Sequence, residues 1–151
     1  MSTAAEHPER ALVRRAVTEG LTDLPVTTNP LAIALGTRLL SARDGGVQMA
    51  FSVGAAFTQG NGVVQGGIVS ALLDFGMTFA AFSQVAADST VATVSQTTNY
   101  FRPALAGELV VDAELEKAGR TLINARATLR DAAGTLLASA TAPIALIKLP
   151  A

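Results

Sequence analysis

A single carboxylate stands in the most apolar part of the sequence. Residues 61–82 read NGVVQGGIVSALLDFGMTFAAF, and Asp74 is the only charged residue between Asp44 and Asp88. Apolar side chains recur on all sides of the predicted helix, which is typical of a helix buried all round. Ser70 and Thr78 lie four residues before and after Asp74, so they share its face. A shielded carboxylate in such a stripe can serve as a general base or a nucleophile.

Two glycines open the same predicted helix. Gly66 and Gly67 occupy the first turn, where free backbone N–H groups carry the positive end of the helix dipole and suit an oxyanion. Glycine lets a ligand approach the backbone closely. Asp74 lies eight residues after Gly66, which is about 12 Å along the axis. One chain therefore cannot bring both to one atom, whereas two antiparallel copies of the helix can.

Each of these residues also has a structural explanation. A buried aspartate can cap a loop or pair with an arginine of the sheet. Thr78 can bond the carbonyl groups of its own helix, and a pair of glycines can simply end a loop. Considered one at a time, none of these features is specific; their common spacing favours the chemical interpretation.

Composition limits the classes of protein and partner. The chain has 151 residues, which fits one domain, and it is 50% hydrophobic but only 15% charged; this balance favours an oligomer. A net charge of −1 gives no electrostatic case for nucleic acid, and the absence of cysteine excludes disulfide and thiol chemistry.

Neither a membrane segment nor a leader peptide is expected. Residues 63–87 are long enough to cross a bilayer, but six polar residues interrupt them and one is a carboxylate. The N-terminus, MSTAAEHPERALVRRAV, lacks the charged and then apolar pattern of a signal peptide. We therefore expect a cytoplasmic protein with no membrane partner.

The remaining sequence predicts one helix wrapped by one antiparallel sheet. Residues 8–20 form a short helix, residues 37–53 form a hairpin around Asp44-Gly45, and residues 66–85 form the long helix. Four strands follow as a meander, at residues 90–101, 109–116, 121–130 and 135–148, with Pro143 marking a bulge or an edge position. The fold class is α+β.

These features together resemble the hotdog-fold acyl-CoA thioesterases, in particular the phenylacetate-degradation type and its hydroxybenzoyl-CoA relatives. In those families a His-Gly-Gly motif opens the central helix, an acid follows eight residues after the first glycine, and Asn or Gln stands seven residues before it. Gly66, Asp74 and Gln59 fit these positions. Thr78 matches a threonine of some members, and TNYFRPALAGELVVDAEL matches the strand after the helix. The resemblance covers residues 32–148.

The resemblance implies a hotdog domain at residues 29–151, preceded by a helix and linker at residues 1–28. It implies hydrolysis of acyl-CoA thioesters by a homodimer or a dimer of dimers, with no metal and no cofactor apart from the coenzyme A of the substrate. The implied catalytic residues are Asp74 as base or nucleophile, Gly66 as oxyanion donor, Gln59 to bond the carbonyl or position water, and Thr78, together with Thr93, to orient Asp74 or the water. The implied substrate-binding residues are Gln65, Gly67, Thr93, Arg102 and Arg120.

One position departs from the family pattern. Gln65 stands where the family has histidine, and the only histidine of the chain is His7. This argues against the hotdog dehydratases, which pair a histidine with their acid. The alternative functions are a non-catalytic acyl-CoA-binding or regulatory hotdog protein, and an unrelated protein with a structural Asp74.

Overall fold

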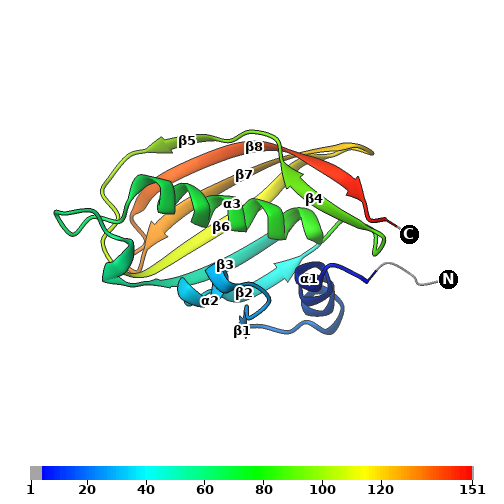
Figure 1. Cartoon of the computed structure of the whole chain (residues 1–151), viewed down its shortest axis with the longest axis horizontal. Helices are drawn as coiled ribbons and strands as arrows, with labels where there is room; N and C mark the ends of the chain where they lie inside the picture. Colours follow the sequence, from blue (N-terminus) through cyan, green and yellow to red (C-terminus); the bar gives the residue numbers. More distant parts are fainter. Residues whose placement is uncertain (1–4, 151) are drawn as a thin grey trace.

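The long apolar helix α3, Gly66–Phe82, lies across one face of an antiparallel sheet (Figure 1). The computed structural model describes residues 5–150; residues 1–4 and 151, which belong to the predicted terminal segments, lie outside the described part. None of the helices in residues 5–150 has both the length and the apolar character needed to span a bilayer. The remaining helices are α1, Pro8–Glu19, α2, Pro30–Ala34, and a short 3₁₀ helix, Ala55–Phe57.

Eight strands form one sheet in the order β1-β2-β3-β6-β7-β8-β4, and β5 pairs with β8 beside β4. Their bounds are Leu24–Pro25 for β1, Arg38–Arg43 for β2, Gly46–Val53 for β3, Ser89–Thr93 for β4, Thr97–Tyr100 for β5, Gly107–Ala118 for β6, Leu122–Asp131 for β7 and Leu136–Lys148 for β8. The predicted hairpin is present as β2 and β3, with Gly45 at φ 83° in its turn.

Two predictions for the strands after α3 are wrong. The four strands do not form one meander, because β3 pairs with β6 along its whole length and leaves β4 and β5 to pair with β8. Helix α3 carries the chain from β3 across the sheet to that far edge. Residues 90–101 are also not one strand, since β4 ends at Thr93 and β5 begins at Thr97.

Pro143 of β8 lies opposite this interruption. β4 ends opposite Ile144 and β5 begins opposite Thr141, and the Pro143 carbonyl accepts a hydrogen bond from the Val94 N–H at 2.9 Å. Proline has no backbone N–H, so Pro143 cannot donate a hydrogen bond to the neighbouring strand, and the ladder is interrupted there. The sequence placed Pro143 at a bulge or an edge, and it lies at a local edge.

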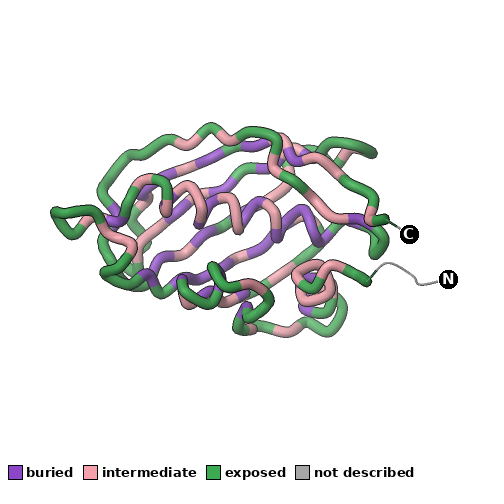
Figure 2. The backbone as a smooth tube through the Cα atoms, in the orientation of Figure 1, coloured by how far each residue is buried: buried purple, intermediate pink, exposed green. Residues whose placement is uncertain are grey.

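Strand alternation divides the sheet into an inner and an outer face. Leu109, Val111 and Ala113 of β6 are buried, as are Ile123 and Leu129 of β7. Figure 2 shows these buried segments running beneath α3. Polar side chains cover the outer face, including the ion pair between Arg126 and Glu114 and the hydrogen bond from Gln48 to Asp112.

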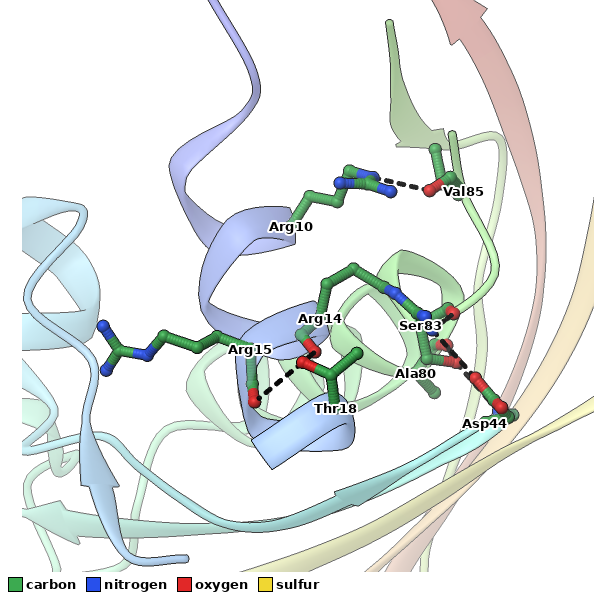
Figure 3. A network of polar contacts seen from close by, with 9 residues as sticks. Arg10, Arg14, Arg15, Thr18, Asp44, Ala80, Ser83 and Val85 are labelled. Atoms are coloured by element: carbon green, nitrogen blue, oxygen red, sulfur yellow. Dashed lines mark hydrogen bonds and ion pairs between the residues drawn. The ribbon is translucent and has the colours of Figure 1, made fainter. Parts of the chain in front are cut away.

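Helix α1 packs on the C-terminal end of α3 (Figure 3). Arg14 donates to the Ser83 carbonyl at 2.7 Å and pairs with Asp44 of the β2–β3 turn, while Arg10 donates to the Val85 carbonyl. The cations face the negative end of the α3 dipole, which is favourable. The Ser83 hydroxyl accepts from the Gly45 N–H at 2.8 Å. α3 therefore ends at Phe82, three residues earlier than predicted.

Helix α3 packs closely on β6 at Gly76. A β-carbon added there would lie 2.4 Å from the Val111 Cγ1 atom and 3.2 Å from the Ala113 Cβ atom. Glycine disfavours helix formation relative to alanine, so its use here is explained by space.

We expect Gly76→Ala to lower the free energy of unfolding by about 1–3 kcal/mol, because the new methyl group overpacks the interface with β6. Chemical denaturation of both proteins would measure the change. Gly54→Ala is the matched control, since a β-carbon there meets nothing within 4 Å and it should change the stability by less than about 0.5 kcal/mol. A Gly76→Ala protein as stable as the control would contradict this account of the interface.

Candidate active site

The face of α3 that the sheet leaves partly uncovered carries the predicted polar stripe. Asp74 and Thr78 are half-buried on this face, and Gly67 is exposed at its start. Ser70 and Asp74 of the stripe, together with residues from the β4–β5 region, line a hollow of about 340 Å³, here called the acid hollow; Thr78 does not line it. Its lining residues are Gly67, Ser70, Ala71, Asp74, Thr93, Gln96 and Thr98.

Thr93 holds the carboxylate of the acid hollow. As the last residue of β4, it donates from Oγ1 to the Asp74 Oδ1 atom at 2.6 Å. This contact fixes one of the two carboxylate oxygens. The bond also leaves the second oxygen of Asp74 to face other groups in the hollow. Thr93, predicted as a substrate-binding residue, is therefore the side chain that orients Asp74 within one chain.

Thr78 makes no hydrogen bond to the Asp74 carboxylate in the described part of the chain. Its hydroxyl donates to the backbone carbonyls of Asp74 at 2.9 Å and Phe75 at 3.2 Å. This is the common arrangement of a threonine within a helix, and it corresponds to the structural explanation given above for this residue.

Gln59 and Gly66 line a different hollow, of about 380 Å³, here called the glycine hollow. Most of its wall is apolar, and the exposed Arg102 lies at it as well. The lining residues are Gln59, Asn61, Val63, Val64, Gly66, Val69, Tyr100, Phe101, Arg102, Pro103, Ala104, Leu137 and Ala138. The Gln59 N–H donates to the Val63 carbonyl at 2.8 Å, which closes the loop that carries Gln59 against α3.

The first turn of α3 has one engaged glycine amide and one available amide. The Gly66 N–H donates to the Oε1 atom of Gln65 at 2.8 Å. The N–H groups of Ile68 and Val69 both donate to the Gln65 carbonyl. Within residues 5–150 no acceptor is found for the Gly67 N–H, and this residue is exposed. Use of the Gly66 N–H by a ligand therefore requires the Gln65 side chain to move away.

No residue lines both hollows. The structure brings Gln59 together with Gly66, and Asp74 together with Thr93, but the two groups lie at different positions along α3. Gly66 and Asp74 are about 12 Å apart along the axis, since they are eight residues apart in a continuous helix.

A chain of hydroxyl groups beside the first turn of α3 was missed by sequence reasoning. The Tyr100 hydroxyl donates to the Gly66 carbonyl at 2.9 Å and lies 2.6 Å from the Ser70 Oγ atom. Ser70 is hydrogen-bonded to Thr98 at 3.1 Å, and the Gln96 amide donates to Thr98 at 2.9 Å. The alternation within β5, which places Thr98 and Tyr100 on one face, is the signal that could have found it.

Other predicted or titratable residues lie outside both hollows or are engaged elsewhere. Arg102 donates to the Leu136 carbonyl at 3.0 Å, and Arg120 is exposed between β6 and β7 and lines neither hollow. The His7 ring stacks on Phe82, with 4.8 Å between centroids, about 24 Å along α3 from Gly66. Residues 5–150 contain no group of three or more His, Asp or Glu side chains with metal-binding geometry.

The central helix and most of the strands that follow it match a known protein family. The sequence profile of the Thioesterase superfamily matches residues 61–138, which is more than half of the chain and includes α3. The chain belongs to the thioesterase superfamily. The match begins in the loop before Gly66 and ends in β8. A comparison with curated proteins by sequence found no match.

Solved structures of this superfamily resemble the chain. A thioesterase family protein from Silicibacter pomeroyi is 32% identical, with a TM-score of 0.75, over 80% of this chain and 90% of that one. A phenylacetic acid degradation-related protein from Ralstonia eutropha is 28% identical, with a TM-score of 0.74, over 79% and 93%. The Escherichia coli PaaI protein from the phenylacetic acid degradation operon is 19% identical, with a TM-score of 0.76, over 97% and 100%. The predicted hotdog fold and the resemblance to phenylacetate-degradation proteins are confirmed.

Proposed function

We propose that this protein hydrolyses acyl-CoA thioesters to a free acid and coenzyme A. The observation that carries the proposal is the Asp74 carboxylate, half-buried on the central helix of a thioesterase superfamily chain and held by Thr93. The chain has no cysteine that could act as a nucleophile, and binding alone does not require an acid in an apolar helix.

Asp74 supplies the reacting group. It removes a proton from water as the water attacks the thioester carbonyl, or it attacks the carbonyl itself and forms a mixed anhydride that water then cleaves. Both routes consume one water, break the carbon–sulfur bond and release the thiol of coenzyme A. Thr93 fixes the carboxylate through one oxygen, so the other oxygen is the one that meets water or substrate.

The first turn of α3 stabilises the charge that develops on the carbonyl oxygen. The Gly66 N–H is the proposed donor, strengthened by the positive end of the helix dipole. The carbonyl displaces Gln65 Oε1 from this N–H, after which the Gln65 side chain and Gly67 contact the substrate. Gln59 bonds the carbonyl or positions the water. Arg102 and Arg120 are the proposed cations for the phosphates of coenzyme A.

The site is assembled from two chains. The glycine hollow and the acid hollow are separate in one chain, and a two-fold axis that sets two α3 helices antiparallel places Gly66 of one copy opposite Asp74 of the other. Self-association is supported by exposed apolar side chains near α3 and the β4–β5 region, namely Val94 at 62%, Tyr100 at 55%, Phe101 at 54% and Leu105 at 64% exposure. A homodimer is the smallest assembly that completes the site, and a dimer of dimers contains the same pair.

Asp74→Asn should lower turnover of acyl-CoA by at least about 100-fold, because it removes the base or nucleophile while keeping the shape of the side chain. Release of free thiol from a panel of aromatic and medium-chain acyl-CoAs would measure this. Asp112→Asn is the control, since Asp112 is an exposed carboxylate on the outer face of the sheet. If Asp74→Asn hydrolyses its substrate as fast as the control, Asp74 is structural and the proposed function fails.

Thr93→Val should reduce kcat by roughly 10-fold to 100-fold, because the carboxylate loses the hydroxyl that orients it. Thr78→Val is the matched substitution on the helix. Within residues 5–150 the Thr78 hydroxyl bonds only backbone carbonyls, so the effect on kcat should be smaller. Steady-state kinetics of the two variants would decide, and a larger loss in Thr78→Val would assign the orienting role to Thr78.

Mixing two inactive variants tests the shared site. Asp74→Ala and Gln59→Ala damage different hollows, so a dimer with one copy of each regains one intact site. Random exchange makes half of the dimers mixed, and activity should return to about a quarter of wild type. The experiment requires each variant to be nearly inactive alone. A mixture of Asp74→Ala with Asp74→Asn is the control, because both lesions fall in the same hollow. Confirmed exchange without recovery would mean that each site lies within one chain.

A further inference from the structure

We propose that the Gly67 N–H is a second oxyanion donor beside the Gly66 N–H, and that Tyr100 is the positioning residue whose hydroxyl group holds the Gly66–Gly67 peptide in that orientation. This inference rests on the proposed function, and it assigns a role to a residue that the catalytic scheme does not use. Tyr100 ends β5 and its hydroxyl donates to the Gly66 carbonyl at 2.9 Å.

The peptide group between Gly66 and Gly67 is planar. The Gly66 carbonyl and the Gly67 N–H belong to one planar unit and point in opposite directions. A donor that fixes the carbonyl therefore also fixes the direction of that N–H. Gly67 is exposed, and its N–H has no acceptor within residues 5–150, so it is free to face a ligand.

Two adjacent glycines need such a restraint more than other residues do. Glycine has the widest choice of backbone angles, and neither Gly66 nor Gly67 has a side chain that packing could hold. The Tyr100 ring lies on this turn, because a β-carbon added at Gly66 would be 3.6 Å from the ring carbons Cε1 and Cζ. A carbonyl oxygen has two lone pairs, so the tyrosine bond adds to the helical one.

The Tyr100 hydroxyl is itself held by the groups behind it. It donates to the Gly66 carbonyl and lies 2.6 Å from the Ser70 Oγ atom, which in turn donates to the Thr98 Oγ1 atom at 3.1 Å. Ser70 and Thr98 are hydrogen-bonded, and Gln96 donates both to Thr98 and to the Ser70 carbonyl. A series of hydrogen bonds of this kind polarises its members and restricts their rotation. The series ends at Gln96, in the segment where β4 gives way to β5.

The same residues connect the two half-sites of one chain. Tyr100 lines the glycine hollow, whereas Ser70, Thr98 and Gln96 line the acid hollow. The hydroxyl series is therefore the polar connection between the turn that binds the oxyanion and the wall around Asp74.

Tyr100→Phe tests the proposal, because it keeps the ring and removes only the hydroxyl. We expect kcat to fall about 10-fold with KM within about twofold of wild type, since a poorly oriented donor weakens the transition state more than ground-state binding. Thr97→Val is the matched control. Thr97 is exposed on the same strand, and its hydroxyl makes no side-chain hydrogen bond within residues 5–150. The kcat of this variant should equal that of wild type.

Ser70→Ala provides a second variant, because it removes the group that orients the tyrosine hydroxyl. Ser70→Ala should lower kcat by a smaller factor than Tyr100→Phe does. The double variant should be no slower than Tyr100→Phe, since the two side chains act through one carbonyl. Losses that multiply in the double variant, or a rise in KM with unchanged kcat, would overturn the positioning role.

A readout independent of activity separates this proposal from the proposed function. The NMR order parameter of the Gly67 amide should fall in Tyr100→Phe and stay unchanged in Thr97→Val. If wild type releases no thiol, the proposed function fails and the order parameter still decides the role of Tyr100. If wild type is active, Asp74→Asn is inactive and the Gly67 amide is equally ordered in both proteins, only the role of Tyr100 is overturned.

Discussion

The contact of α3 with β6 at Gly76 sets the depth at which the central helix lies. The absence of a side chain there lets the helix backbone approach Val111 and Ala113 more closely than any other residue would allow. Because Gly76 faces β6, the residues on the opposite side of α3 are left beside β4 and β5. Asp74, Thr78 and Ser70 lie on that side, half-buried rather than enclosed. The chemistry assigned to Asp74 therefore depends on the close packing of Gly76 on the opposite side of the same helix.

Much of this arrangement could be predicted from the sequence, because the relevant signals are local. The 3.6-residue period of α3, the Asp44-Gly45 turn and the alternation in β6 and β7 each follow from neighbouring residues. The stripe of Ser70, Asp74 and Thr78 follows from helical spacing alone. The spacing of Gly66 and Asp74 along one helix also predicts that the two groups lie apart, and the structure places them in different hollows.

The remaining features depend on which segments become neighbours, which spacing does not show. β4 and β5 pair with β8 rather than with β6, because β3 occupies that edge of β6. The contact of Thr93 with Asp74, and of Tyr100 with Gly66, depends on the interruption opposite Pro143, which shifts the chain between the two strands. Thr78 lies on the face that the spacing predicts, but spacing does not show that its hydroxyl donates to carbonyl groups of its own helix.

The crossover made by α3 also governs how quickly the chain can reach this fold. β6, β7 and β8 are joined by short turns, so their pairing closes small loops and can form early. β3 has to find β6 across a long intervening segment; Ser52 and Glu108, which are paired and hydrogen-bonded, are 56 residues apart in sequence. That segment includes α3, so β6 has no partner strand on its β3 side until α3 has packed on the sheet. We therefore expect the slow step of folding to be the docking of the β2–β3 hairpin onto a preformed meander, with the edge of β6 exposed to association with other chains until it is complete.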